Sequence, residues 1–211
     1  MTTRKLALAG LVGPPLFAVL VVFLTAIEWD FLHDIGWSAG LFNNPKAPWP
    51  SSTALGDYGF LQVLNFLLLG ISVLALAFAL FPLLDVRRKV GPSLLLIAGT
   101  AAVCSAFKTD YATVRGDSPD TWNGVVHVIA FFSLAVAMLA SMFVLASQFR
   151  RDERWRSLSR YSLIGAVIAL ASIIANFASA GTLFFYVFLA VILPWLTFVA
   201  AHALSLAREP A

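Results

Sequence analysis

The chain has 211 residues, of which 60% are apolar and 12% charged, and its mean hydropathy is +0.88. These values exclude a soluble domain of this size and predict an all-α polytopic membrane protein. The single cysteine, Cys104, excludes an intramolecular disulfide and a cysteine-only metal cluster. A net charge of +3 does not indicate a nucleic-acid partner, because the basic residues flank apolar segments instead of forming one patch.

The apolar segments, taken in chain order, predict one transmembrane domain covering residues 1–211. The first run, 6–27, is too long for a signal-peptide core and lacks a small-residue cleavage site, so it is interpreted as a span. Pro14 and Pro15 predict that this helix kinks or restarts there and then continues to about Asp34. Further spans are predicted at about 58–84, 93–107, 122–147, 161–178 and 183–206.

The longest connection, residues 28–57, carries three tryptophans, Trp29, Trp37 and Trp49. Thirty irregular residues are unusual in a compact protein, and tryptophan favours the membrane interface. We therefore expect this segment to lie on the bilayer surface or to fold over the mouth of the bundle as an extracytoplasmic lid.

The basic residues predict the orientation of the six-helix bundle. Eleven of the 14 fall on the side of the two termini, and only Lys46, Lys108 and Arg115 fall on the other. The positive-inside rule then places both termini in the cytoplasm of a cell (inner) membrane. Seven of the 11 acidic residues lie on the outer side, which predicts a mouth that attracts cations.

Polar residues near the outer ends of the spans predict a polar cup beneath the lid. Its candidate ligand-binding residues are Gln62, Asn65, Asp110, His127 and Asn176. Ionisable and amide side chains inside a membrane commonly mark ligand sites, although each could also be a hydrogen-bonding contact between helices. Asp110 is expected to be the partner of His127, because the chain between them returns to the same side of the membrane. A helix start is expected near Pro119, with Ser118 as its cap.

A metal site is a second interpretation of the same residues. Asp30, His33 and Asp34 would share one face of an extended first helix, so His33, Asp110 and His127 are candidate ligands for a divalent ion. Embedded zinc hydrolases usually use three nitrogen ligands, and at most two are available on this side, so we expect no cofactor. Ser105 lacks a nucleophile motif, and no glycine-rich phosphate loop occurs.

On the cytoplasmic side, the segment Arg150 to Arg160 interleaves arginines with Trp155 and Leu158. This pattern predicts an interfacial helix that contacts anionic lipid. His202 lies near the same end of the last span and is expected to be an interfacial side chain.

Three stretches also resemble a known family: Leu55 to Gly70, Phe107 to Asp110 (FKTD) and Gly124 to His127 (GVVH). They are similar to the six-span bacterial and archaeal membrane family catalogued as domain of unknown function 998. In that family a Phe-x-Thr-Asp segment closes the third helix and a Gly-x-x-His segment opens the fourth. Lys108 stands where the family often has proline. The resemblance implies a fold and a membrane location, but no activity.

Three functions therefore remain open. The leading hypothesis is a non-catalytic membrane protein that binds or transports a small cationic or amphipathic molecule, or a lipid, in the outward cup. The alternatives are a membrane-embedded metal-dependent hydrolase and an envelope or interaction protein whose cup is only helix packing.

Overall fold

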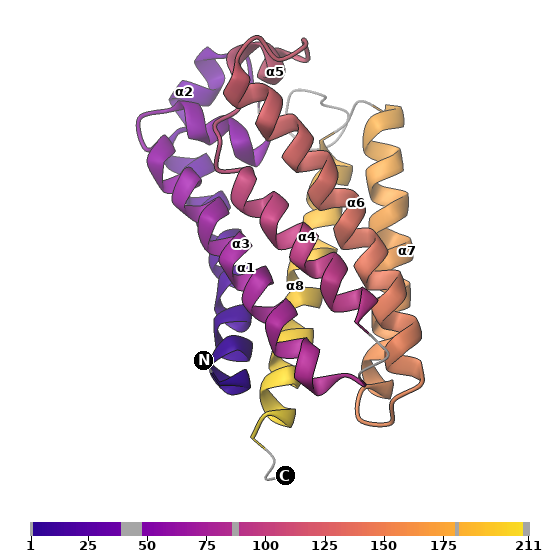
Figure 1. Cartoon of the computed structure of the whole chain (residues 1–211). Coiled ribbons are helices and arrows are strands. Elements are labelled where there is room, and N and C mark those ends of the chain that lie inside the picture. The colour runs from indigo at the N-terminus through magenta and orange to yellow at the C-terminus, as the bar shows by residue number, and fades with distance from the viewer. Residues whose placement is uncertain (1, 39–47, 86–88, 180–181, 209–211) are drawn as a thin grey trace.

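Six apolar helices lie side by side in the computed structural model, which describes residues 2–38, 48–85, 89–179 and 182–208 (Figure 1). Their bounds are α1 Thr3–Ile27, α3 Gly59–Leu83, α4 Val90–Cys104, α6 Trp122–Arg150, α7 Arg156–Ser179 and α8 Leu183–Leu206. The beginning of α1 and the end of α8 lie at one end of the bundle (Figure 1). The short helices α2 (Trp29–Asp34) and α5 (Tyr111–Arg115) lie at the opposite end, which we call the mouth. The 3₁₀ helix η1, Pro50–Leu55, packs against α3.

The six helices form a closed ring. Each packs against its neighbours in the order α1, α3, α4, α6, α7 and α8, and α8 returns to α1. Leu76, Leu80, Met138, Met142 and Trp195 are completely or almost completely buried at the centre. Other apolar side chains, such as Val22, Ile71 and Val136, are more than half exposed. An apolar exterior around an apolar core is the pattern of a helical bundle in lipid, and it confirms the predicted polytopic helical fold.

Helix α4 differs from the other five in length. Those five have the length and composition to cross a membrane, whereas α4 has 15 residues. At 1.5 Å per residue α4 is about 22 Å long, which is shorter than a hydrocarbon core of about 30 Å. Its carboxyl end therefore needs hydrogen-bond partners from the rest of the bundle.

Helix α1 does not restart at Pro14, although the two prolines predicted a kink or a restart there. It begins at Thr3, runs through both prolines and ends at Ile27, and α2 follows as a separate helix. The neighbouring helix supports the turn before the prolines, because Ser72 Oγ donates to Ala9 O at 2.8 Å. The predicted third span, 93–107, is also shifted, since α4 already begins at Val90 and ends at Cys104.

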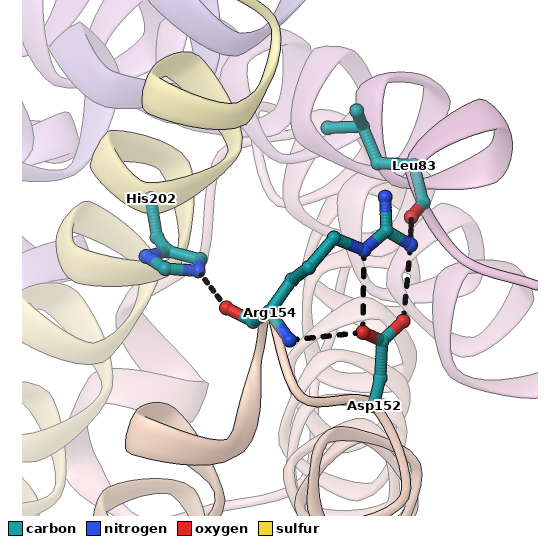
Figure 2. Close-up of polar contacts among 4 residues, drawn as sticks. All are labelled: Leu83, Asp152, Arg154 and His202. Atoms are coloured by element: carbon teal, nitrogen blue, oxygen red, sulfur yellow. Dashed lines mark hydrogen bonds and ion pairs between the residues drawn. The ribbon is translucent and has the colours of Figure 1, made fainter. Parts of the chain in front are cut away.

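The turn between α6 and α7 is tied to two other helices near the end that holds the termini (Figure 2). The Arg154 guanidinium donates through Nη2 to Asp152 Oδ2 and to Leu83 O, both at 3.1 Å. His202 Nε2 donates to the carbonyl oxygen of Arg154 at 2.7 Å. This turn thus joins α3 and α8.

Trp155 corrects the prediction of an interfacial helix at this turn. Its side chain is fully buried, stacks on Phe149 at 4.7 Å between ring centroids, and meets the His202 ring edge-on at 4.8 Å. His202 is half-buried between these contacts, and its expected place at the membrane interface stays a prediction. The spacing of Trp155 and Leu158 could not show the burial of Trp155, because the stacking partners come from α6 and α8. Two of the basic residues that were counted for the predicted orientation, Arg87 and Arg88, lie outside the described residues.

We predict that the mouth is outside the cell and the termini inside. In a Cys104→Ser background, Asp117→Cys should react with a membrane-impermeant thiol reagent in intact cells, whereas Ser157→Cys should react only after permeabilisation. Both positions are exposed, so accessibility within the protein does not bias the comparison. The opposite labelling pattern would reverse the orientation.

Candidate functional site

Asp110 organises the loop between α4 and α6. Its Oδ1 accepts hydrogen bonds from Thr113 N at 2.8 Å and Thr113 Oγ1 at 2.6 Å, which caps the first turn of α5. Its Oδ2 accepts from Asp120 N at 3.2 Å, Thr121 N at 3.1 Å and Thr121 Oγ1 at 2.9 Å. One carboxylate therefore holds both ends of the 110–121 segment.

The start of α6 is built onto the same carboxylate. Thr121, and not Ser118, is the cap, and its Oγ1 accepts from Gly124 N at 3.0 Å. A Cβ atom at position 124 would lie 1.9 Å from Asp110 Oδ2, so only glycine allows the carboxylate this close to the helix. The pairing explains why the FKTD and GVVH segments occur together in one chain.

The hydrogen bonds keep Asp110 ionised. Burial alone raises the pKa of this carboxyl, but the hydrogen bonds from Thr113 and Thr121 outweigh it and hold the pKa well below its usual range. Only 6% of the residue is exposed. The negative charge is thus enclosed by donors of its own loop, and Asp110 does not line the cavity described below.

His127 serves the short helix α4. Its Nδ1 lies 3.0 Å from Ser105 O and 2.8 Å from Phe107 O, and since carbonyl oxygens only accept, Nδ1 carries the hydrogen. The ring therefore caps the carboxyl end of α4, and it also meets the Phe66 ring edge-on at 5.8 Å. The expected pairing with Asp110 is replaced by these carbonyl bonds. Energetic coupling between the two residues stays a prediction.

Gln62 and Asn65 join α1 to α3. Both are completely buried, and Asn65 Nδ2 donates to Phe17 O at 3.2 Å and to Gln62 Oε1 at 3.4 Å. Asn176 is buried in α7, at 5% exposure. None of the three lines either of the two cavities described below, and their part in ligand binding stays a prediction.

The mouth instead contains a cavity of about 730 Å³. Its walls come from the loops after α2 and α4, from η1 and from the outer parts of α6 and α7. The residues are Ile35, Gly36, Trp37, Trp49, Ser51, Ser52, Thr109, Thr113, Val114, Arg115, Gly116, Asp117, Pro119, His127, Val128, Phe131, Phe132 and Phe177. His127 is the member of the expected cup that lines it.

A second, apolar cavity of about 60 Å³ continues into the bundle. It shares Trp49, Ser51, His127 and Phe131 with the mouth cavity, so the two adjoin at these residues. Its deeper wall is formed by side chains such as Phe66, Met138 and Leu193. The wall of the mouth cavity is largely apolar, with the charged residues Arg115 and Asp117 exposed at its rim, and the wall of the second cavity is apolar almost throughout.

Trp49 closes one side of both cavities. Its ring packs 4.7 Å from Phe185 and 6.0 Å from Phe131, and Tyr186 Oη donates to Pro48 O at 2.6 Å. The described part of the 28–57 connection is thereby fastened to α6 and α8, while residues 39–47 lie outside the described residues. At its base, Glu28 Oε1 accepts from Tyr58 N at 2.5 Å. Glu28 is only 4% exposed. The sequence did not indicate this burial, because Glu28 stands among other acidic residues of the same connection.

Three residues of the cavity wall have buried polar atoms without a hydrogen-bond partner within the described ranges: Trp37 Nε1, Ser52 Oγ and Thr109 Oγ1. Such an atom typically costs about 1 to 3 kcal/mol. Sequence analysis placed Thr109 in the FKTD segment and Trp37 in the expected lid, but it selected none of the three as a candidate binding residue.

The candidate metal ligands are not brought together. His33 is exposed on α2, and across residues 2–38, 48–85, 89–179 and 182–208 no group of three or more His, Cys, Asp or Glu side chains could hold a metal ion. His127 and Asp110 have the backbone and hydroxyl partners described above.

Comparison with known proteins gives one match. The family model described as "Protein of unknown function (DUF998)" matches residues 11–202. No curated protein and no solved structure matches the chain. The matched range covers all six long helices at least in large part and includes both the FKTD and GVVH segments.

We predict that Gly124→Ala destabilises the fold by at least about 1.5 kcal/mol. The new methyl group displaces a carboxylate whose hydrogen bonds, being to a charged group, contribute about 1.5 to 3 kcal/mol each. The measurement is reversible unfolding of the purified protein in mild detergent.

Gly165→Ala is the matched control for this change. At Gly165 the nearest atom to a new Cβ is the flexible Met142 Cε, at 3.1 Å, so the variant should be neutral or slightly stabilised. In an Asp110→Ala background, Gly124→Ala should cost at least 0.5 kcal/mol less than in the wild type, beyond the usual limit of additivity, about 0.5 kcal/mol. Equal costs in both backgrounds would contradict the Asp110–Gly124 contact as the cause.

Proposed function

The chain belongs to the DUF998 family of membrane proteins, and we propose that it binds an amphipathic molecule at the mouth of its helix bundle. The family description names no activity, so the proposal rests on the geometry of the site. The observation that carries it is the junction of a roomy cavity, which has the exposed charged residues Arg115 and Asp117 at its rim, with a smaller apolar one at His127 and Phe131.

The size and the walls of the mouth cavity fit a small molecule. Ligand sites commonly enclose about 300 to 1,000 Å³ and combine aromatic walls with a few placed polar groups. Here Phe131, Phe132 and Phe177 supply apolar wall, while Arg115 and Asp117 supply charged groups at the rim. A molecule with one polar and one apolar part would match both ends of this space.

The charges favour an amphipathic molecule over a small cation. A cation would need an accessible acid, but Asp110 is enclosed by five hydrogen bonds from its own loop. Asp117 is exposed at the rim, two residues from the oppositely charged Arg115. We therefore do not retain a small inorganic or organic cation as the ligand.

The remaining hypotheses have less support. A hydrolase would need a group of metal ligands or an activated nucleophile, and His127 uses its Nδ1 hydrogen to cap α4. An interaction protein with a purely structural mouth would not need a cavity of about 730 Å³ there. Binding assays distinguish these possibilities directly.

We further propose that the protein resides in the cell membrane and that the arginines of Arg150 to Arg160 contact anionic lipid. Supporting this, Arg150, Arg151, Arg156 and Arg160 are all exposed around the α6–α7 turn. Glu153 neutralises only part of this charge, through a 3.7 Å pair with Arg156. Trp155 does not contribute to such a surface, because it is buried.

The lipid contact predicts a loss of retained anionic lipid in the variant Arg156→Gln/Arg160→Gln. Each basic residue near a membrane surface contributes about 1 kcal/mol, so retention of phosphatidylglycerol in native mass spectrometry should fall several-fold. Arg115→Gln, at the opposite end of the bundle, is the control. Equal retention by the two variants would contradict a specific contact at this turn.

The proposed binding site predicts that Val128→Trp weakens binding of a fluorescent single-chain amphiphile by at least tenfold, because Val128 lines the mouth cavity and indole would fill it. Binding is measured by fluorescence anisotropy with protein reconstituted in phosphatidylcholine nanodiscs. Ile129→Trp is the matched control, since its side chain is 61% exposed on the outside of the same helix. No saturable binding by the wild type, or equal effects of both variants, would overturn the proposal.

A further inference from the structure

Two phenyl rings belong both to the wall of the mouth cavity and to the outer surface of the bundle. Phe132 of α6 and Phe177 of α7 line the cavity, and they are 47% and 58% exposed. Phe132 lies three residues after Ile129 and four before Val136, both more than half exposed, so the three side chains share one face of α6. Phe177 shares a face of α7 with the exposed Ile174 in the same way. The mouth cavity therefore reaches the surface of the bundle that faces lipid.

Aromatic rings continue from this surface into the bundle. The rings of Phe177 and Phe132 stack with their centroids 5.8 Å apart, and the Phe132 ring lies 5.4 Å from that of Phe131. Phe131 meets the Trp49 ring at 6.0 Å, and Trp49 packs 4.7 Å from Phe185, which is only 6% exposed. The walls of the two cavities thus carry a row of aromatic contacts that begins at the lipid-facing surface and ends in the core.

The helices that hold the Phe132–Phe177 pair separate toward the mouth. The turn after Arg150 joins α6 to α7 at the other end, and from there α6 leans toward α5 and away from α7 (Figure 1). At the level of the mouth the stacked rings of Phe132 and Phe177 bridge the two helices. Exposed side chains change rotamer within picoseconds to nanoseconds, so the two rings can part without a movement of either helix.

The depth of the pair places it in the leaflet on the mouth side. At 1.5 Å per residue, Phe132 lies about 27 Å from the exposed Arg150, the last residue of α6. A hydrocarbon core of about 30 Å that begins at Arg150 therefore ends just beyond Phe132. Trp122, the first residue of α6, is 73% exposed and lies about 15 Å farther out, in the headgroup region that tryptophan favours. The Phe132–Phe177 pair thus faces lipid chains close below the headgroups.

The rest of the space decides how an amphipathic molecule would lie. The exposed charged residues Arg115 and Asp117 stand at the rim of the mouth cavity. The apolar cavity inside the bundle measures about 60 Å³, which is too small for a long alkyl chain. The side closed by Phe132 and Phe177 has no such limit, because lipid continues beyond the two rings. A head in the mouth cavity is therefore compatible with a chain that lies in the bilayer.

We infer that the mouth cavity opens sideways into the bilayer between α6 and α7, past Phe132 and Phe177, and that its ligand is a single-chain lipid of the mouth-side leaflet. The head of this lipid lies in the mouth cavity, and its chain passes between the two rings and stays among the lipid chains. This inference rests on the proposed function and adds the source of the ligand, which is the bilayer and not the water.

The first test maps the chain with a lysophosphatidylcholine that carries a photoactivatable diazirine in the middle of its acyl chain. The protein is held in phosphatidylcholine nanodiscs, and cross-linked residues are identified by mass spectrometry. The saturable cross-links, defined as those that Val128→Trp removes, should lie at Phe132, Phe177 and Ile174. Saturable cross-links at Phe66, in the wall of the apolar cavity, would overturn the sideways opening.

The second test closes the opening with a covalent bridge. In a Cys104→Ser background, Phe132→Cys and Phe177→Cys are joined by a short bifunctional methanethiosulfonate, which suits two side chains whose rings lie 5.8 Å apart. Because the bridge occupies the path of the chain, the affinity for the lysophosphatidylcholine probe should fall at least tenfold and return when the bridge is reduced. The same variant without the bridge is the reference, so an effect of the substitutions themselves does not enter. An affinity that the bridge leaves unchanged would overturn the inference.

Tyr161→Cys/Phe198→Cys, in the same background and treated with the same reagent, is the matched control. These two rings meet at 5.5 Å between α7 and α8, and both side chains are exposed. Tyr161 lies in the first part of α7, at the end away from the mouth, so a bridge there should change the affinity less than twofold. An equal loss of affinity in both bridged variants would contradict a specific opening at Phe132 and Phe177.

The outcomes separate this inference from the proposed function. If Val128→Trp abolishes saturable cross-linking but the Phe132–Phe177 bridge has no effect, amphiphile binding stands and the sideways opening is overturned. If the wild type gives no saturable cross-linking, both proposals fall together.

Discussion

The arrangement of the mouth depends on the way α4 ends. This helix is about 22 Å long by its 15 residues, so it stops short of a full crossing, and its last carbonyl groups lie where water is scarce. His127 resolves this by donating one ring hydrogen to Ser105 O and Phe107 O. The chain can then leave the helix and form an irregular loop at the mouth while these two carbonyl groups keep a hydrogen-bond partner.

Asp110 stabilises the loop that follows α4. Once the chain has left α4, its carboxylate gathers donors from Thr113, Asp120 and Thr121, so that α5 and the start of α6 are built around one buried charge. Gly124 leaves room for that charge against the first turn of α6. Both residues that looked most like a binding site therefore have a structural role, and the loop they hold becomes one wall of the mouth cavity.

The cavity separates the residues that build the site from those that would contact a ligand. Among Asp110, Gly124 and His127, only His127 lines the cavity, since its Nδ1 caps α4 while its ring forms part of the wall. The rest of the cavity wall comes from η1, α5, α6 and α7 and from the loops after α2 and α4.

The amino-acid sequence by itself determined the class of the protein, the approximate position of its helices and the importance of Asp110, Gly124 and His127. These properties depend on local hydropathy, on helix signals and on short motifs, all of which act along the chain. It misassigned the partners of Asp110 and His127 and the burial of Trp155. Those features depend on the rotation and depth of helices that are distant in sequence.

In a membrane bundle the core and the lipid are equally apolar, so an apolar helix carries little information about which face points inward. Only the packing of α1, α3, α4, α6, α7 and α8 into a ring decided which polar atoms meet and which residues line the cavities.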